Sequence, residues 1–284
     1  MGRFFYVVQG AGAGFLFGTA SIFVRFLYSM DAFSIAFFRV LVAGLLISSA
    51  GLIIRRRNLL QQMLRFFTVL PFLGILLGLH FIFFISAIKT TAVVNATTLV
   101  NTTPAIALTI GWAQGWIKPS SLNLFGLLLT IAGAVSMTAG EFSLNPQNVL
   151  GDFYAVLGAL AWALYLVVGK RVREEAEIVV VMGPIYLWTA LATGVKGLLS
   201  GGLTQPRPEE LYPLTALAIL PTVLGHSLQF SSLKGLHPYE ASALALLEPV
   251  VATILAAVVL SEVVEPGFYL SAAVVIAGIY LVMR

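Results

Sequence analysis

The sequence predicts an all-α integral membrane protein with ten transmembrane helices, arranged as two inverted five-helix repeats. Three observations lead to this fold class. Of the 284 residues, 59% are hydrophobic and only 10% are charged, against about 25% charged in an ordinary soluble domain. The apolar residues form long uninterrupted runs, and the two halves of the chain resemble each other at a fixed spacing. This composition excludes a water-soluble enzyme, a disordered chain and a nucleic-acid-binding protein.

The first half of the chain contains five apolar runs. A helix that crosses a bilayer needs roughly 20 mostly apolar residues. Interruptions by charged, Pro, Gly and Asn residues place these spans at about 4–27, 33–54, 66–87, 91–114 and 122–139. The first run is too long for the apolar part of an export signal, which has roughly 7–15 residues. We therefore expect it to be retained as a span.

The second half contains five further runs, at about 151–169, 178–199, 212–232, 238–260 and 267–283. The connections between all these runs are too short to hold a separate folded domain. The strands of a transmembrane barrel are about ten residues long and alternate between apolar and polar side chains. The runs found here are continuous and about twice that length, so they predict helices.

The basic residues predict the orientation of the chain. If the N-terminus is cytoplasmic, eleven of the sixteen Lys and Arg residues fall in cytoplasmic segments. The other five, which include Arg39 and Lys89, fall on the opposite side or at helix ends. Cytoplasmic connections are enriched in Lys and Arg. Because the number of spans is even, we expect both termini in the cytoplasm.

An internal repeat appears when the chain is shifted by 145 residues against itself. The shift superposes Ser86, Lys89, Ala96 and Pro104 on Ser231, Lys234, Ala241 and Pro249. The first span carries small residues at Gly10, Gly14 and Gly18, and the sixth carries them at Ala155, Ala159 and Ala163. Small residues four apart line one helix face and allow another backbone to approach closely.

The repeat divides the chain into residues 1–143 and residues 144–284. Each half contains an odd number of spans, so the second half begins on the opposite side of the membrane. The halves are therefore inverted relative to each other. Inverted repeats with a binding site at their interface are typical of secondary transporters.

The repeated segments resemble the EamA type of the drug/metabolite transporter superfamily. The likeness is carried by Ser86-Ala87-Ile88-Lys89 through Thr103-Pro104, by Ser231-Ser232-Leu233-Lys234 through Glu248-Pro249, and by Leu260-Ser261-Glu262 with Ala277-Gly278. Within the superfamily, the chain is most similar to the YddG-type aromatic amino-acid exporters. The resemblance implies a ten-helix fold in a bacterial inner membrane. It also implies export of amino acids or related small metabolites.

Matched prolines and polar residues within the spans indicate where a substrate binds. Pro104 and Pro249 occupy equivalent positions in the fourth and ninth spans, where each removes a backbone hydrogen bond. Matched interruptions in two inverted halves point to a central site. Ionisable side chains inside a bilayer are candidates for function. We expect the substrate to contact His80, Asn101, Trp162, Tyr165, His226, Gln229 and Glu248.

Each of these side chains also has a purely structural interpretation. Asn101 is one of several polar residues in the fourth span that can join neighbouring helices. Trp162 and Tyr165 can pack in the protein interior, and a neutral histidine can bond to a backbone carbonyl. At the offset of the repeat, His80 corresponds to Gly225, one residue before His226. The sequence leaves both interpretations open.

Two other functions are alternatives to amino-acid export. Exchange of sugar phosphates or nucleotide sugars needs several cations at mid-membrane depth, whereas Lys89, Lys170, Arg171 and Lys234 lie near predicted span ends. An intramembrane enzyme needs a nucleophile or a metal site, and no G-x-S-x-G or H-E-x-x-H pattern occurs. The sequence also lacks a phosphate-binding loop, which excludes an ATP-driven pump in this chain.

We expect neither a metal nor a cofactor. The chain has no cysteine, and no second ligand stands at chelating spacing beside His80 or His226. The expected partners are the lipid bilayer and a small-molecule substrate, with no nucleic acid, and a monomer suffices for this function.

Overall fold

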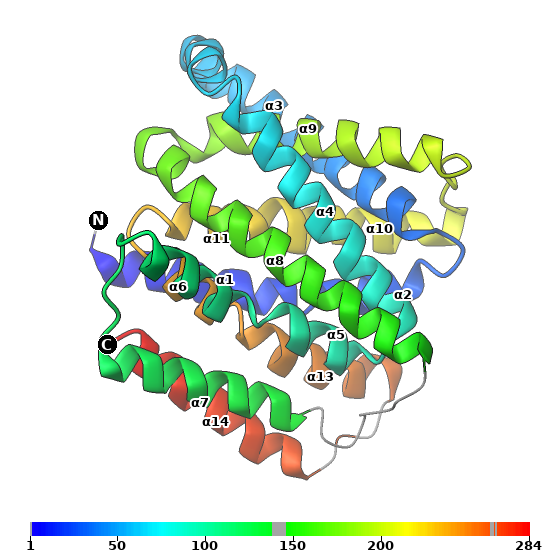
Figure 1. The fold of residues 1–284 in the computed structure, drawn as a ribbon. Coiled ribbons are helices and arrows are strands. Elements are labelled where there is room, and N and C mark those ends of the chain that lie inside the picture. Colours follow the sequence, from blue (N-terminus) through cyan, green and yellow to red (C-terminus); the bar gives the residue numbers. More distant parts are fainter. Residues whose placement is uncertain (1, 138–145, 262–263, 265) are drawn as a thin grey trace.

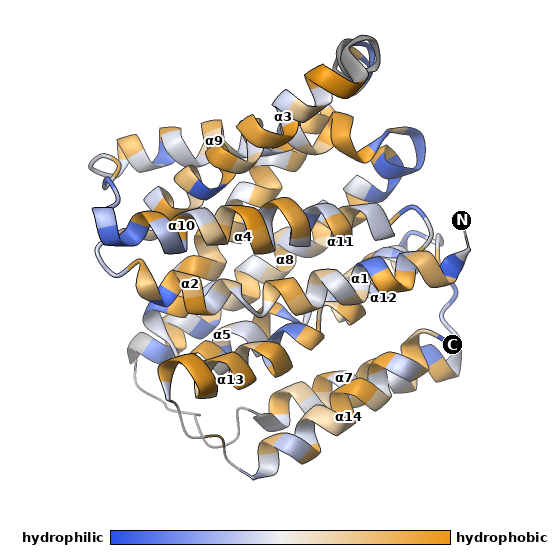
Figure 2. Ribbon diagram, turned by 180° about the vertical axis from the view of Figure 1, so that it is seen from behind, coloured by the Kyte–Doolittle hydropathy of each residue, from blue (hydrophilic) through white to orange (hydrophobic). Residues whose placement is uncertain are grey.

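The structure, a computed structural model, describes residues 2–137, 146–261, 264 and 266–284, and within these ranges it contains helices and no β-strand. The helices lie side by side, and the two termini lie at the same side of the molecule (Figure 1). Hydrophobic residues follow the lengths of the helices, whereas hydrophilic residues gather near their ends (Figure 2). The predicted boundary between residues 143 and 144 and the side chain of Glu262 lie outside the described residues.

The first half forms α1 (Arg3–Phe17), α2 (Ala20–Phe26), α3 (Ala32–Arg65), α4 (Val69–Thr90), α5 (Val93–Val100), α6 (Thr103–Ala113) and α7 (Ser121–Met137). The second half forms α8 (Pro146–Glu175), α9 (Ile178–Leu199), η1 (Pro208–Glu210), α10 (Leu211–Leu217), η2 (Ala218–His226), α11 (Ser227–Ser232), α12 (Pro238–Leu244), α13 (Leu247–Leu260) and α14 (Gly267–Val282). Among these, η1 is a 3-10 helix and η2 is a π-helix.

Seven segments of the described chain are helical, apolar and long enough to cross a membrane. They correspond to the first, second, third, sixth, seventh, eighth and ninth predicted spans. The fifth and tenth runs form the shorter apolar helices α7 and α14, of 17 and 16 residues. The fourth run is divided into α5 and α6. The apolar runs therefore predict where helices lie better than they predict helix length.

Two helices continue beyond the predicted spans. The second predicted span ends near residue 54, but α3 continues to Arg65, and α8 continues past residue 169 to Glu175. Both extensions are rich in Arg, Leu, Gln or Glu, which are good helix formers. An apolar run therefore ends before its helix does. Hydropathy indicates whether side chains face lipid or water, and it does not indicate where the helical backbone ends.

The fourth and ninth spans are both broken next to the matched prolines. Pro104 lies in the first turn of α6, and Pro249 lies in the first turn of α13, where the missing N–H costs little. The carbonyl of Val100 accepts a hydrogen bond from Thr103 Oγ1 at 2.7 Å, and that of Ala245 accepts one from Glu248 N at 2.8 Å. The carbonyls four residues before the prolines, which lose their usual helical donor, therefore have local partners.

The helices pack in pairs that join the two halves of the chain. α3 lies along α9, α4 lies along α8, and α7 lies along α14 (Figure 1). α1 contacts η2, α11, α12 and α13. The pair α7–α14 lies at one edge of the molecule, and α3–α9 lies at the opposite edge. Helices α1, α4, α8 and η2 are left in the middle, where a site can form.

The two ladders of small residues face the broken helices. A Cβ atom built on Gly14 lies 3.2 Å from the Cα atom of Ala245, at the junction of α12 and α13. Ala155, Ala159 and Ala163 are fully buried on α8, which packs against α5 and α6. The carbonyl of Ala159 accepts a hydrogen bond from Thr103 Oγ1 at 3.3 Å. In both halves, small side chains allow close approach beside a helix break.

Asp31 closes the beginning of α3 at the side of the molecule away from the termini. Its Oδ1 accepts hydrogen bonds from the backbone N–H groups of Phe33 and Ser34 at 2.8 and 3.0 Å. Its Oδ2 accepts one from Thr204 Oγ1 at 3.0 Å. Partial burial alone would raise the pKa of Asp31, but the hydrogen bonds from Ser34, Thr204 and Phe33 outweigh it and lower the pKa.

Candidate functional site

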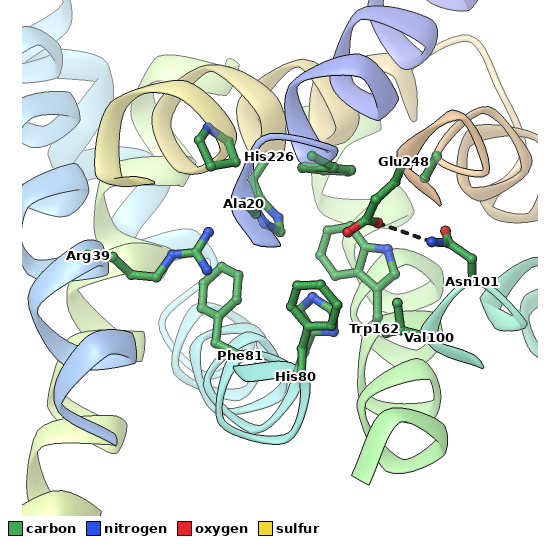
Figure 3. Close-up of a pocket in the computed structure, with 13 residues that line it drawn as sticks. Ala20, Arg39, His80, Phe81, Val100, Asn101, Trp162, His226 and Glu248 are labelled. Carbon is green, nitrogen blue, oxygen red and sulfur yellow. Dashed lines mark hydrogen bonds between the residues drawn. The ribbon is translucent and has the colours of Figure 1, made fainter. Parts of the chain in front are cut away.

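A small internal cavity lies among the central helices (Figure 3). Its volume is about 20 Å³, which is room for about one water molecule. Residues from both halves of the chain line it: Phe17, Ala20, Arg39, His80, Phe81, Phe84, Val100, Asn101, Trp162, Pro221, His226, Ala245 and Glu248. The cavity is therefore closed to any solute of metabolite size in this conformation.

Stacked rings form one wall of the cavity. His80 stacks on Trp162 with ring centroids 4.9 Å apart, and Trp162 stacks on Tyr165 at 4.9 Å. The ring of Phe84 lies parallel to that of His80, with ring centroids 5.9 Å apart. His226 meets Trp162 edge-on at 4.9 Å. Such a wall suits a flat or apolar group, because aromatic rings bury a large area in fixed geometry.

The two predicted histidines meet in this wall. Their ring centroids are 6.1 Å apart, although the residues lie in α4 and η2. His80 Nδ1 lies 3.1 Å from the carbonyl of Gly158. Because a carbonyl only accepts, Nδ1 carries the hydrogen and Nε2 of the neutral ring is an acceptor. Within the described residues, His226 Nδ1 has no hydrogen-bond partner.

Glu248 lies in the wall formed by the broken ninth span. It is 6% exposed and lies in the first turn of α13, where the helix dipole stabilises a negative charge. Its Oε2 accepts a hydrogen bond from Asn101 Nδ2 at 3.1 Å (Figure 3). The same Asn101 nitrogen donates to the carbonyl of Thr97 at 2.7 Å. The breaks in the fourth and ninth spans thus bring these two side chains together.

Arg39 reaches the cavity from α3. It is 1% exposed, its Nε donates to Thr222 Oγ1 at 2.9 Å, and its guanidinium lies 4.2 Å from the centre of the Phe81 ring. The pattern of basic residues grouped Arg39 with those on the non-cytoplasmic side or at helix ends, and it lies inside the membrane-capable segment that starts at Ala32, as the predicted span 33–54 also has it. A charged residue within an apolar run was the signal that could have identified it.

Five of the seven predicted contact residues line the cavity, namely His80, Asn101, Trp162, His226 and Glu248. Tyr165 lies behind Trp162, is fully buried, and donates from its hydroxyl to Met182 Sδ at 3.7 Å. Gln229 is fully buried and donates from Nε2 to the carbonyl of Ala241 at 2.8 Å. These two side chains support the wall of the cavity and do not line it.

A second, larger cavity of about 250 Å³ lies between α6, α8 and the start of α12. Lys170 and Arg171 are among its lining residues. Lys170 Nζ lies 3.0 Å from Glu174 Oε1, and the Arg171 guanidinium lies 4.6 Å from the centre of the Trp116 ring. The described residues contain no group of three His, Asp or Glu side chains that could hold a metal ion.

The sequence profile of the EamA-like transporter family matches residues 4–139 and again residues 149–284. Over 279 residues, the chain is 26% identical to an uncharacterized transporter of Archaeoglobus fulgidus, covering 92% of this chain and 91% of that protein. Over 173 residues, it is 29% identical to a probable amino-acid metabolite efflux pump of Salmonella typhimurium, covering 56% of each. A solved crystal structure shares the fold, with a TM-score of 0.79 at 20% identity over 97% of this chain and 95% of that one.

The apolar helices, the central cavity and these relatives define a multi-pass membrane transporter with a small-molecule substrate. The chain belongs to the EamA-like transporter family.

Proposed function

We propose that this protein is a secondary transporter that exports amino acids, including aromatic ones, and related small metabolites. The observation that carries the proposal is the central cavity. Stacked rings lie in its wall, together with one buried carboxylate and one buried guanidinium. The relative from Salmonella typhimurium that is named as a probable amino-acid metabolite efflux pump supports the same direction of transport.

The fine architecture is part of this proposal. Ten membrane-crossing segments form two inverted five-helix repeats, residues 1–143 and 144–284, with both termini in the cytoplasm of a bacterial inner membrane. Two observations support it: the family profile matches the chain twice at the offset found in the sequence, and α4 packs on α8 as α11 packs on α1. These two pairs are equivalent under the repeat.

The chain contains no cysteine, which makes this topology easy to test. Ser120 and Gly201 lie in connections that the proposal places on the cytoplasmic and the opposite side of the membrane, respectively, and each can be replaced by a single cysteine. A membrane-impermeant maleimide applied to intact cells should label Gly201→Cys and leave Ser120→Cys unlabelled until the cells are opened. Equal labelling of both in intact cells would contradict the inverted arrangement.

The size of the cavity supports transport by alternating access. The space for about one water molecule must widen before a metabolite can bind, so the helices around it must move apart. The larger cavity near Lys170 and Arg171 lies on the side of the termini and serves as an entrance from the cytoplasm. A contact on that side, between Arg3 Nη2 and Glu240 Oε1 at 2.6 Å, joins α1 to α12 and would have to open.

Reconstituted vesicles provide the direct test of the substrate. Vesicles that contain the protein should take up labelled threonine, methionine or phenylalanine with saturable kinetics, and empty vesicles should not. Absence of saturable flux for all three would refute the amino-acid assignment. A sugar phosphate added as competitor should have no effect, since Arg39 is the one Lys or Arg side chain among the residues that line the central cavity of the described structure.

A further inference from the structure

The guanidinium of Arg39 has hydrogen-bonding capacity that the protein does not use. Arg39 is 1% exposed. Within the described residues its single hydrogen bond comes from Nε, and no carboxylate forms an ion pair with it. The head group extends from α3 toward the cavity (Figure 3). A buried cation without an anionic partner is costly, so donors left free at a cavity point to an anionic group of a ligand.

The position of this guanidinium is fixed from behind. The hydroxyl of Thr222 accepts from Arg39 Nε and donates to the carbonyl of Leu217 at 2.7 Å, so its orientation is set. The Tyr186 hydroxyl donates to the carbonyl of Thr222 at 2.7 Å. Thr222 and Tyr186 therefore act as positioning residues. With Nε held, the two terminal nitrogens form a planar fork that matches the two oxygens of a carboxylate.

Glu248 provides the opposite charge on the other side of the same cavity. Its Oε2 accepts from Asn101, and the described residues offer it no further hydrogen bond. Arg39 and Glu248 lie on opposite sides of the cavity in Figure 3, with aromatic rings between them. The two charges attract each other across the cavity but form no ion pair, so the hydrogen-bonding positions of both remain available to a molecule placed between them.

We infer that Arg39 binds the carboxylate, and Glu248 with Asn101 binds the ammonium group, of one zwitterionic α-amino acid whose side chain lies against His80 and Trp162. The inference rests on the proposed function and deepens it, because it requires both charges on the substrate. A molecule with only one of them leaves a buried group of the site without its partner, which costs affinity. The site therefore rejects both amines and carboxylic acids of the same shape.

Three molecules that differ only in these charges test the inference on the native protein. Phenylalanine, phenethylamine, which lacks the carboxylate, and 3-phenylpropionate, which lacks the ammonium group, are compared as competitors of labelled phenylalanine uptake. Each single-charge molecule should compete at least about tenfold more weakly than phenylalanine, given the usual strength of a charge-assisted hydrogen bond. Equal competition by all three would overturn the inference while leaving amino-acid transport intact, whereas absence of phenylalanine uptake would overturn both.

Two variants assign the charges to their residues. Arg39→Gln should weaken the binding of phenylalanine and leave that of phenethylamine unchanged. The ratio of the two affinities should therefore fall at least about tenfold. Glu248→Gln should weaken the binding of phenylalanine and leave that of 3-phenylpropionate unchanged, so that the ratio of these two affinities falls in the same way. Arg25→Gln and Glu209→Gln, both at exposed positions, are the matched controls. If Arg39→Gln does not fold, Arg39→Lys keeps the charge but loses the fork and should give an intermediate ratio. Unchanged ratios in the folded variants would overturn the assignment.

Discussion

Gly14 on α1 gives the sharpest prediction about how the cavity is held in place. A Cβ atom added at this position would overlap the backbone carbonyl oxygen of Leu244 and lie 3.2 Å from the Cα atom of Ala245. Both atoms belong to the backbone at the end of α12, so neither can rotate away. We expect Gly14→Ala to cost about 1–3 kcal/mol of stability, the usual cost of overpacking.

The effect should extend to transport, because Ala245 lines the cavity and precedes Glu248 by less than one turn. Displacing this segment moves the carboxylate relative to Asn101. Gly14→Ala should therefore lower the rate of amino-acid uptake more than its loss of folded protein explains. The measurements are unfolding by denaturant in detergent and uptake per folded molecule in vesicles.

Two neighbouring glycines provide a graded control. A Cβ on Gly12 would make an ordinary contact, 3.6 Å from the Leu228 side chain, so Gly12→Ala should be close to neutral. A Cβ on Gly10 would meet the movable side-chain tip of Leu244, so Gly10→Ala should fall between the two. If Gly14→Ala proves as stable and as active as Gly12→Ala, the argument that backbone contact requires glycine at position 14 is wrong.

Three other expectations follow from the structure. Trp162→Ala should slow the uptake of aromatic substrates and lower the free energy of unfolding by about 3–5 kcal/mol, because it is a large-to-small change in a packed wall. Trp162→Phe should retain most of that stability. If both variants take up substrate as fast as the native protein, Trp162 is not part of the site. Asn101→Ala removes the donor to Glu248 and should weaken amino-acid binding by about 1.5–3 kcal/mol, measured as thermal stabilisation by phenylalanine. Asp31→Ala should cost about 1 kcal/mol at neutral pH as a lost helix cap. Because the pKa of Asp31 is lowered in the folded protein, the native protein should remain more stable than Asp31→Ala down to the unfolded pKa near 3.9. This difference in stability should shrink as the pH falls through the folded pKa. A difference that stayed constant below that pH would refute a role for the ionised carboxylate.

Much of the site was predictable because its residues break a strong pattern. His80, Trp162 and Glu248 are polar or amphipathic side chains within apolar runs, and such residues are expensive in a bilayer unless they have a role. All three line the cavity. Arg39 breaks the same pattern, but it lies in the second turn of its predicted span, where a basic residue also reports the orientation of the chain, and it was not among the expected contact residues.

Other features depend on contacts that a single sequence does not display. Tyr165 and Gln229 have the same chemistry as cavity residues, yet they bond to Met182 and to the Ala241 carbonyl behind the wall. Phe81 and Phe84 line the cavity but look like ordinary apolar residues in the sequence. Side-chain chemistry predicts that a residue needs a partner, and only packing decides whether that partner is protein or ligand.

The π-helical turn in η2 makes the two halves of the chamber unlike each other. Each hydrogen bond of such a helix spans one residue more than in an α-helix, so a side chain can take the place that its predecessor would otherwise fill. His226, one position later than the equivalent of His80, thereby meets Trp162, and Gly225 leaves space in which Phe17 lies. The two walls therefore carry different residues at equivalent positions, and we expect a solute with two different ends to bind in one orientation.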